Sequence, residues 1–184
     1  QALLVNCSKG IDPKTFQLTS QLLDACLPKH DKLLRAVLSG PSFAHEVALG
    51  MPTSVVLAGE SLSTLERMQK IFHRKTFLPF LSEDPIGVQV GGAVKNVIAI
   101  AAGLSAGLNF GHNTLAALVT LGLYEMMKVG HVLGAKARTF AGLSGLGDLV
   151  LTTTSEQSRN FSVGKALGRG ESVEKILQGK MVAE

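Results

Sequence analysis

Short apolar runs alternate with amphipathic stretches in the first 84 residues of the chain. Apolar runs that end in turn residues predict buried strands, here at 2–6, 33–39, 52–59 and 76–82. Pro79 lies inside the fourth run and favours an edge or irregular strand. Helical spacing predicts a helix over 15–27, and Ser63 and Glu66 match a capping box that would begin another. The alternation predicts a mostly parallel sheet covered by helices.

The pattern changes after Asp84-Pro85, where helical spacing replaces the strand-like runs. Residues 86–108 predict a long apolar helix, and a second runs from about Asn113, a plausible cap, to Leu133 and stops at Gly134. Beyond it, the chain predicts a loop around a short apolar turn at 143–158, then helices at 159–167 and 173–177. We therefore expect the end of an α/β domain at 1–84 and an all-α domain at 85–184.

The run at 86–108 is also long and apolar enough to cross a bilayer. It contains Gln89, Lys95 and Asn96, and a lysine in the middle of a membrane costs about 2.5 kcal/mol or more. These polar residues favour a buried helix in a soluble core, and we expect no integral membrane association.

Composition narrows the class of partner. Of the 184 residues, 46% are hydrophobic and 17% charged, which is typical of a folded globular protein. Aromatic residues make up 5% of the chain, with no Trp, and leave little material for stacking single-stranded nucleic acid. The basic residues behind the net charge of +4 are scattered, so we expect no nucleic-acid partner and favour a small anionic metabolite.

Cysteine and histidine spacing predicts neither disulfides nor metal. Cys7 and Cys26 do not form a CxxC pair, and we expect buried thiols in a reducing compartment. The five histidines lack metal-ligand spacing, so no metal site is expected. The chain opens without an initiating Met and contains no GxGxxG motif. If a dinucleotide binds, we expect its phosphate-binding turn to lie upstream of Gln1.

Lys95 is the most informative candidate, because it is a cation inside the apolar run GGAVKNV. On a helix it shares a face with Gly91 and Gly92, and we expect the glycines to leave open space for a small substrate. Burial and a nearby second cation would lower its pKa, so that it could exchange a proton with a hydroxyl or ketone oxygen. A lysine that reaches the surface from a buried stem is the alternative.

Other candidates lie at predicted loops. Lys9 follows the first strand, where ligands of open α/β sheets bind, and the Gly40–Phe43 turn could present the Ser42 hydroxyl to the same cleft. Ser158, Arg159 and Asn160 stand at an expected helix start and make a plausible phosphate site. Asp148 could orient Lys95, bind a substrate hydroxyl or cap a turn. Each of these is also compatible with an ordinary solvated loop residue.

Several blocks taken in order resemble the bacterial-type NAD(P)-dependent glycerol-3-phosphate dehydrogenases over nearly the whole chain. They are SKGID, LSGPSFAHEVALGMPTSVVLA, IGVQVGGAVKNVIAIAAGLSAGL, GLSGLGDLVLTTTSEQSRNFSVG and the terminal VAE. The resemblance implies the C-terminal part of a Rossmann-like parallel-sheet domain. An all-α substrate domain of the type found at the C-terminus of 6-phosphogluconate dehydrogenase would follow.

The resemblance also implies a function. A cytoplasmic enzyme would interconvert sn-glycerol 3-phosphate and dihydroxyacetone phosphate with NAD or NADP, supply glycerophospholipid synthesis, and allow for a homodimer. Lys95 would be the catalytic acid/base and a substrate contact. The other substrate contacts would be Lys9, Gly40, Ser42, Asp148, Ser158, Arg159 and Asn160. The cofactor contacts would be Lys9, Ala44, Arg159 and Glu184.

Two alternatives stay open at this point. A related NAD(P)-dependent hydroxyacid dehydrogenase could share the two-domain plan and a helix lysine followed by asparagine. A non-catalytic helical interaction module would instead pack its glycine-rich helix against another subunit and leave Lys95 solvated.

Overall fold

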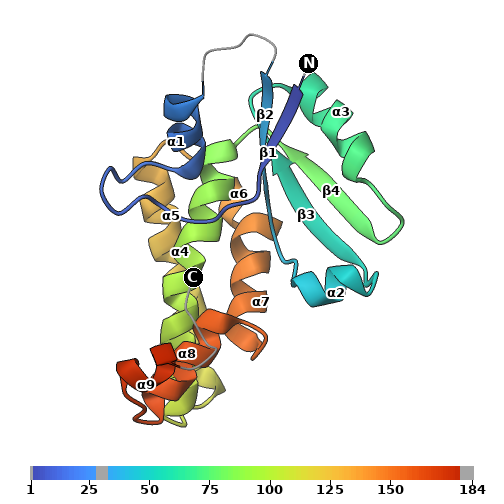
Figure 1. Cartoon of the computed structure of the whole chain (residues 1–184). Coiled ribbons are helices and arrows are strands. Elements are labelled where there is room, and N and C mark those ends of the chain that lie inside the picture. Colours follow the sequence, from blue (N-terminus) through green and yellow to red (C-terminus); the bar gives the residue numbers. More distant parts are fainter. Residues whose placement is uncertain (1, 28–32, 179–184) are drawn as a thin grey trace.

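A computed structural model describes residues 2–27 and 33–178 and shows a sheet followed by a group of helices (Figure 1). Strands β1 (Ala2–Asn6), β2 (Leu33–Ser39), β3 (Thr53–Ala58) and β4 (Phe77–Ser82) form one sheet in the order β1-β2-β3-β4. The four strands agree with the apolar runs of the sequence to within two residues. β4 is an edge strand of the sheet. The missing N–H of Pro79 therefore removes no hydrogen bond between inner strands.

The sheet is mixed. β1 pairs with β2 and β3 pairs with β4 in parallel, whereas β2 and β3 are antiparallel. The segment between β2 and β3 contains the short helix α2 (Ala44–Ala48) in place of a long crossover helix, and the chain returns along the strand it has just left. Sequence patterns did not predict α2, because five residues are too few to show a helical period.

Two helices of the first half begin at other residues than expected. α3 (Leu62–Phe72) starts after Ser61, whose Oγ accepts a hydrogen bond from the Thr64 amide, so the capping box predicted at Ser63 is wrong by two residues. Leu65 and Met68 of this helix pack on the sheet. α1 (Thr19–Cys26) is shorter than predicted, because Phe16 has a positive φ of 57°, which no helix accommodates.

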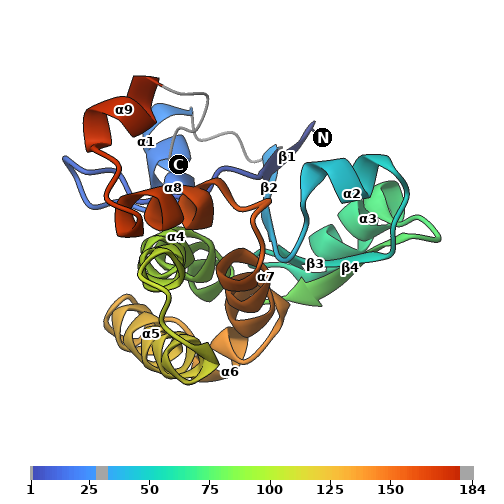
Figure 2. The ribbon, with the colours of Figure 1, turned by 90° about the horizontal axis from the view of Figure 1, so that it is seen from below.

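Helix α4 (Pro85–Gly107) is the centre of the helical part, and it starts where Asp84 caps the Gly87 amide. Figure 2, which looks nearly along this helix, shows other helices around it. The longer ones are α5 (His112–Val132), α7 (Asp148–Thr154) and α8 (Arg159–Gly168), with α6 (Ala137–Phe140) and α9 (Val173–Gln178) beyond them. The predicted helix that begins near Asn113 is confirmed, although its N-cap is Gly111.

The loop predicted at 143–158 is wrong over most of its length. A π-helical turn, η1 (Leu143–Gly147), runs directly into α7. The three successive threonines of α7 do not break the helix, because their hydroxyls donate to backbone carbonyls of the preceding turn; Thr153 Oγ1, for example, lies 2.8 Å from Leu149 O.

By length and composition, α4 and α5 could each cross a membrane. Of the most apolar window, 61% is buried within the protein for α4 and 11% for α5. Burial of α4 agrees with the expectation of a core helix. Its Gln89 side chain holds α1 in place, with Oε1 accepting from the Ser20 amide and Nε2 donating to Ser20 Oγ, both at 2.9 Å.

Candidate functional site

A cavity of about 440 Å³ lies where the sheet meets the helical part. Its walls come from the loops after β1 and β2, from α4 and α7, and from the start of α8. The lining residues are Lys9, Ser42, Phe43, Ala44, Lys95, Asn96, Asp148, Leu151, Thr152, Gln157, Ser158, Arg159 and Asn160. Residues far apart in the sequence, and most of those predicted to form a site, are therefore brought together here.

Lys95 is buried in this wall, with 6% of its surface exposed. Its Nζ donates hydrogen bonds to Asp148 Oδ1 at 2.6 Å and to Thr152 Oγ1 at 3.0 Å. The second carboxylate oxygen of Asp148 accepts from Lys9 Nζ at 2.8 Å. One buried carboxylate thus joins two lysines, one from α4 and one from the loop after β1.

The pKa of Lys95 is lowered from its ordinary value of 10.5 to about 8. Burial is the main cause, because the charged ammonium loses its hydration. The Asp148 carboxylate opposes this effect by favouring the charged form, and the positive charge of Lys9 adds to it. A lysine in this state can lose and regain a proton near neutral pH.

The glycines beside Lys95 have a different purpose from the one expected. Neither Gly91 nor Gly92 lines the cavity, so the expectation that they leave space for a substrate is wrong. A Cβ on Gly91 would lie 2.4 Å from the Ser144 carbonyl oxygen, and one on Gly92 would lie 3.0 Å from Ser39 Oγ. Both glycines therefore let α4 approach η1 and the end of β2.

The turn after β2 contributes a second wall. Ser42 and Ala44 line the cavity, and Ser42 Oγ donates to the Gly40 carbonyl at 3.1 Å. Gly40 itself does not line it. Its φ of +139° and the 3.0 Å that would separate an added Cβ from Val55 Cα show that glycine is needed here for the turn.

The third wall is the beginning of α8. Ser158 is the N-cap, and its Oγ accepts from the Phe161 amide at 3.2 Å. Ser158 and Asn160 are buried, whereas Arg159 is exposed at the cavity. A guanidinium beside the first amides of a helix is a suitable environment for an anion.

The remaining lining residues were not predicted. They are Phe43, Asn96, Leu151, Thr152 and Gln157. Thr152 follows Asp148 by one helical turn, so the spacing would have indicated it had the helix α7 been predicted. Asn96 is buried, and no described residue donates a hydrogen bond to its Oδ1. Glu184, predicted as a cofactor contact, lies outside the described residues.

The expectation that the two cysteines are buried is wrong. Cys7 and Cys26 are both exposed, because one follows the last residue of β1 and the other ends the short helix α1. In the part of the chain that the structure describes, no group of three or more His, Cys, Asp or Glu side chains is placed to hold a metal ion.

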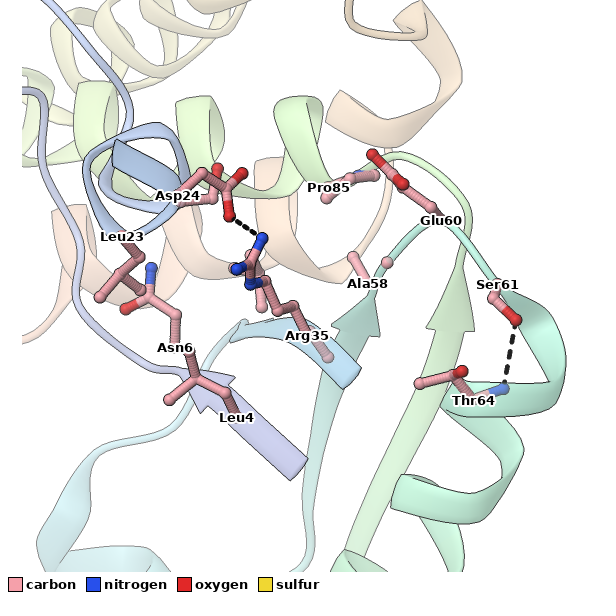
Figure 3. A pocket seen from close by; sticks show the side chains of 14 residues that line it. Leu4, Asn6, Leu23, Asp24, Arg35, Ala58, Glu60, Ser61, Thr64 and Pro85 are labelled. Carbon is pink, nitrogen blue, oxygen red and sulfur yellow. Dashed lines mark hydrogen bonds and ion pairs between the residues drawn. The ribbon is translucent and has the colours of Figure 1, made fainter. Parts of the chain in front are cut away.

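A second cavity, of about 290 Å³, lies between α1, the sheet and the start of α3 (Figure 3). Arg35 extends into it and forms an ion pair with Asp24, and Glu60 and Ser61 lie on the far side. None of the residues predicted to bind a substrate or cofactor lines this cavity. The candidate site is therefore the cavity at Lys95.

The fold and the site together define a class: a Rossmann-like sheet followed by an all-helical unit, with a buried lysine and an arginine at the cavity between them. Family models agree. The model described as the NAD-dependent glycerol-3-phosphate dehydrogenase N-terminus matches residues 1–65, and the model of the C-terminus matches 84–184. The chain belongs to the NAD-dependent glycerol-3-phosphate dehydrogenase family.

Individual relatives are similar over the whole chain. A curated glycerol-3-phosphate dehydrogenase (NAD(P)+) of Citrifermentans bemidjiense is 50% identical over 185 residues, which cover 100% of this chain and 55% of the relative. That of Geobacter sulfurreducens is 49% identical over 183 residues, or 99% of this chain and 55% of the relative. The chain thus spans about half the length of the curated relatives it matches.

Solved structures are similar as well. The crystal structure of glycerol-3-phosphate dehydrogenase from Coxiella burnetii has a TM-score of 0.88 and 41% identity, covering 95% of this chain and 52% of that one. Glycerol-3-phosphate dehydrogenase from Saccharomyces cerevisiae has a TM-score of 0.82 and 26% identity, covering 96% and 54%.

Proposed function

We propose that the full-length protein containing this chain interconverts sn-glycerol 3-phosphate and dihydroxyacetone phosphate with NAD or NADP, and so supplies glycerophospholipid synthesis. The observation that carries this proposal is the burial of Lys95 at a cavity, with its Nζ 2.6 Å from Asp148 and its pKa lowered to about 8. Relatives of 50% identity named glycerol-3-phosphate dehydrogenase support the same substrate.

The charges of the cavity suit a phosphorylated substrate. Its described lining carries three cations, Lys9, Lys95 and Arg159, against the single carboxylate of Asp148. Arg159 is the first residue of α8 and lines the cavity beside the amides that begin this helix, so its guanidinium is placed to bind a phosphate. The distance between the walls would then set how far the phosphate lies from the reacting carbon.

The residues present fit the reactive end of a dinucleotide. Phe43 and Ala44 offer an apolar surface in the cavity, and the buried Asn96 Oδ1 offers an acceptor that no described residue uses. Lys9, Ala44 and Arg159 would be the cofactor contacts from this part of the chain. When bound, NAD(P) supplies a site for hydride transfer to or from the C2 carbon of the substrate.

Lys95 would move the proton. Asp148 and Thr152 occupy two of the three positions around its Nζ, so the third can meet a substrate oxygen. In oxidation the neutral amine accepts the proton of the C2 hydroxyl as that carbon loses its hydride. In reduction the ammonium returns a proton to the ketone oxygen.

Substitution of Lys95 in the full-length protein tests the proposal. Lys95→Ala should lower kcat by about 10²- to 10⁴-fold, and much more than it changes substrate binding. Lys95→Arg keeps the charge beside Asp148 but cannot deprotonate, so it should fold and lose turnover as well. The matched control is Lys128→Ala on the exposed face of α5. Near-normal turnover by a folded Lys95→Arg enzyme would refute the role.

Substrate choice has a separate test. A hydroxyacid dehydrogenase would turn over 3-hydroxyisobutyrate better than glycerol 3-phosphate, and the predicted preference is the reverse. A homodimer and a cytoplasmic location are further proposals, to be checked by light scattering and cell fractionation of the full-length protein.

A further inference from the structure

One hydrogen bond joins two walls of the cavity. Gln157 Nε2 donates to Glu46 Oε1 at 3.0 Å, across 111 residues of sequence. Glu46 belongs to α2, which follows β2, and Gln157 to the turn between α7 and α8. In Figure 2 the segment from α7 to α8 passes close to α2, in agreement with this hydrogen bond.

The bond lies at the cavity. Two residues before Glu46, Ala44 lines the cavity, and Gln157 lines it from the opposite wall together with Ser158. Glu46 itself does not line it. The pair therefore connects the walls beside the space in which a ligand would bind, without placing the Glu46 carboxylate inside that space.

The turn that carries Gln157 is fixed to α8. Ser162 Oγ donates to the Glu156 carbonyl at 2.9 Å, and Lys165 forms an ion pair with the Glu156 carboxylate. Since α2 belongs to the sheet side and this turn belongs to α8, any change in the separation of the two sides must stretch the bond between Glu46 and Gln157.

We propose that Glu46 and Gln157 are a positioning pair, which holds Ser42 and Ala44 at a fixed distance from Ser158 and Arg159 around the bound substrate. This proposal rests on the proposed function and adds the residues that set the width of the site. Neither residue acts on the reacting atoms.

The expected effect is on binding. The bond is exposed and has one charged partner, so its loss should weaken substrate binding about 3- to 10-fold. The pair acts on the substrate complex and the transition state alike, and its loss should therefore raise the KM for glycerol 3-phosphate with little change in kcat.

Four variants of the full-length protein test this. Glu46→Ala and Gln157→Ala should each raise KM about 3- to 10-fold. Gln157→Glu should raise it at least as much, because two carboxylates would face each other. Adding Glu46→Gln to Gln157→Glu exchanges donor and acceptor and should restore KM to within about 2-fold of wild type. The control, Glu125→Ala, removes an exposed carboxylate bound to Lys128 on α5 and should leave KM unchanged.

A loss of folded protein would lower kcat per mole in all variants and would not be rescued by the exchange. Unchanged KM in the single variants, or an exchanged pair as impaired as Gln157→Glu alone, would overturn the proposal. A wild type without glycerol 3-phosphate turnover would instead refute the proposed function.

Amide hydrogen exchange tests directly whether the bond between Glu46 and Gln157 holds the turn in place, because this measurement does not depend on turnover. In Glu46→Ala, the amides of residues 155–158 should exchange faster than in wild type, while those of α5 should not change. Equal exchange at 155–158 would overturn the proposal independently of any activity.

Discussion

Asp148 accepts a 2.6 Å hydrogen bond from Lys95, although the two residues are 53 positions apart and belong to different helices. Both side chains are nearly inaccessible: counted without the backbone, 8% of the lysine side chain and 2% of the aspartate side chain are exposed. Because the pKa of Lys95 is about 8, its charged and neutral forms are present in similar amounts near that pH. Burial favours the neutral amine and Asp148 favours the ammonium, and that balance makes proton exchange available near neutral pH.

Replacing Asp148 by Asn should change this balance in one direction. The variant keeps the shape of the side chain but removes the charge that raises the pKa of Lys95, while burial and Lys9 continue to lower it. We expect the pH midpoint of kcat in the oxidative direction to fall by about 1 to 3 pH units. Turnover should fall about 10- to 100-fold through loss of orientation. Asp24→Asn, at an exposed ion pair, is the control; a midpoint that rises in Asp148→Asn would contradict the assignment.

The pH dependence of the wild type follows from the same group. With a pKa of about 8, Lys95 is mainly protonated below pH 8 and mainly neutral above it. Oxidation needs the neutral amine, so kcat for glycerol 3-phosphate oxidation should rise through pH 8 and level off. Reduction needs the ammonium, so kcat for dihydroxyacetone phosphate should fall through the same region. Two profiles that rise together would exclude Lys95 as the shared acid and base.

Stability should depend on Lys95 in the opposite way to an ordinary ion pair. Its pKa in the folded protein is below its ordinary value of 10.5, so the unfolded chain binds more protons between pH 8 and 10.5. The contribution of this group to the free energy of unfolding should therefore rise with pH across that window. Urea unfolding of the wild type and of Lys95→Met at pH 8 and pH 10 would measure it; a contribution that decreases over this range would contradict the lowered pKa.

Sequence patterns found the four strands of the sheet and the long helices because apolar runs alternate with turn residues, and they found Lys95 because a cation inside an apolar run is conspicuous. They did not show why Gly91 and Gly92 are glycines, since the atoms that fill the space, Ser144 O and Ser39 Oγ, come from distant segments. The antiparallel pairing of β2 and β3 was not predicted for a similar reason. An apolar run does not tell the direction in which a strand pairs.

The same limit explains the failure at 143–158. Glycines and threonines disfavour a helix locally. Here they are tolerated because Gly145 packs against the backbone of Phe140 and because the threonine hydroxyls bond to the preceding turn. Tertiary packing outweighs propensity in this segment. Thr152, which adjoins Asp148 in the site, was missed in consequence.

Asp84 offers a stability test away from the cavity. Its buried carboxylate accepts from the Gly87 amide, the Lys136 amide and Thr139 Oγ1, and so holds the start of α4 to α6 and its N-cap residue. Asp84→Ala should lower the free energy of unfolding by about 2–4 kcal/mol, because buried donors lose their acceptor.

The control for this variant is Asp12→Ala. Asp12 also accepts three hydrogen bonds, but from the exposed residues Lys14 and Thr15. Water can replace those bonds, and the loss should stay below about 1 kcal/mol. Urea denaturation of both variants in the full-length protein would compare them. Equal losses would show that burial of Asp84 is not the cause.

The crossing of α4 and α8 depends on glycines, and replacing them by alanine should destabilise the protein, contrary to the usual effect of this substitution in a helix. Alanine in place of glycine within a helix normally stabilises it by about 1 kcal/mol. At Gly164, however, an added Cβ would lie 2.0 Å from the Ile100 carbonyl oxygen, and at Gly103 it would lie 2.0 Å from that of Phe161. Backbone atoms cannot yield as side chains do, so α8 must move away from α4, and Gly164→Ala should cost about 1–3 kcal/mol or more.

Gly147→Ala supplies the comparison, because Gly147 has helical angles of −61° and −50° and an added Cβ would meet its nearest neighbours at 3.7 Å. That variant should be neutral or slightly more stable in urea denaturation. Movement of α8 also shifts Arg159 at its first turn, so Gly164→Ala should raise the KM for glycerol 3-phosphate in the folded enzyme. An unfolding midpoint and a KM equal to those of wild type would show that the close approach of the two helices does not position the arginine.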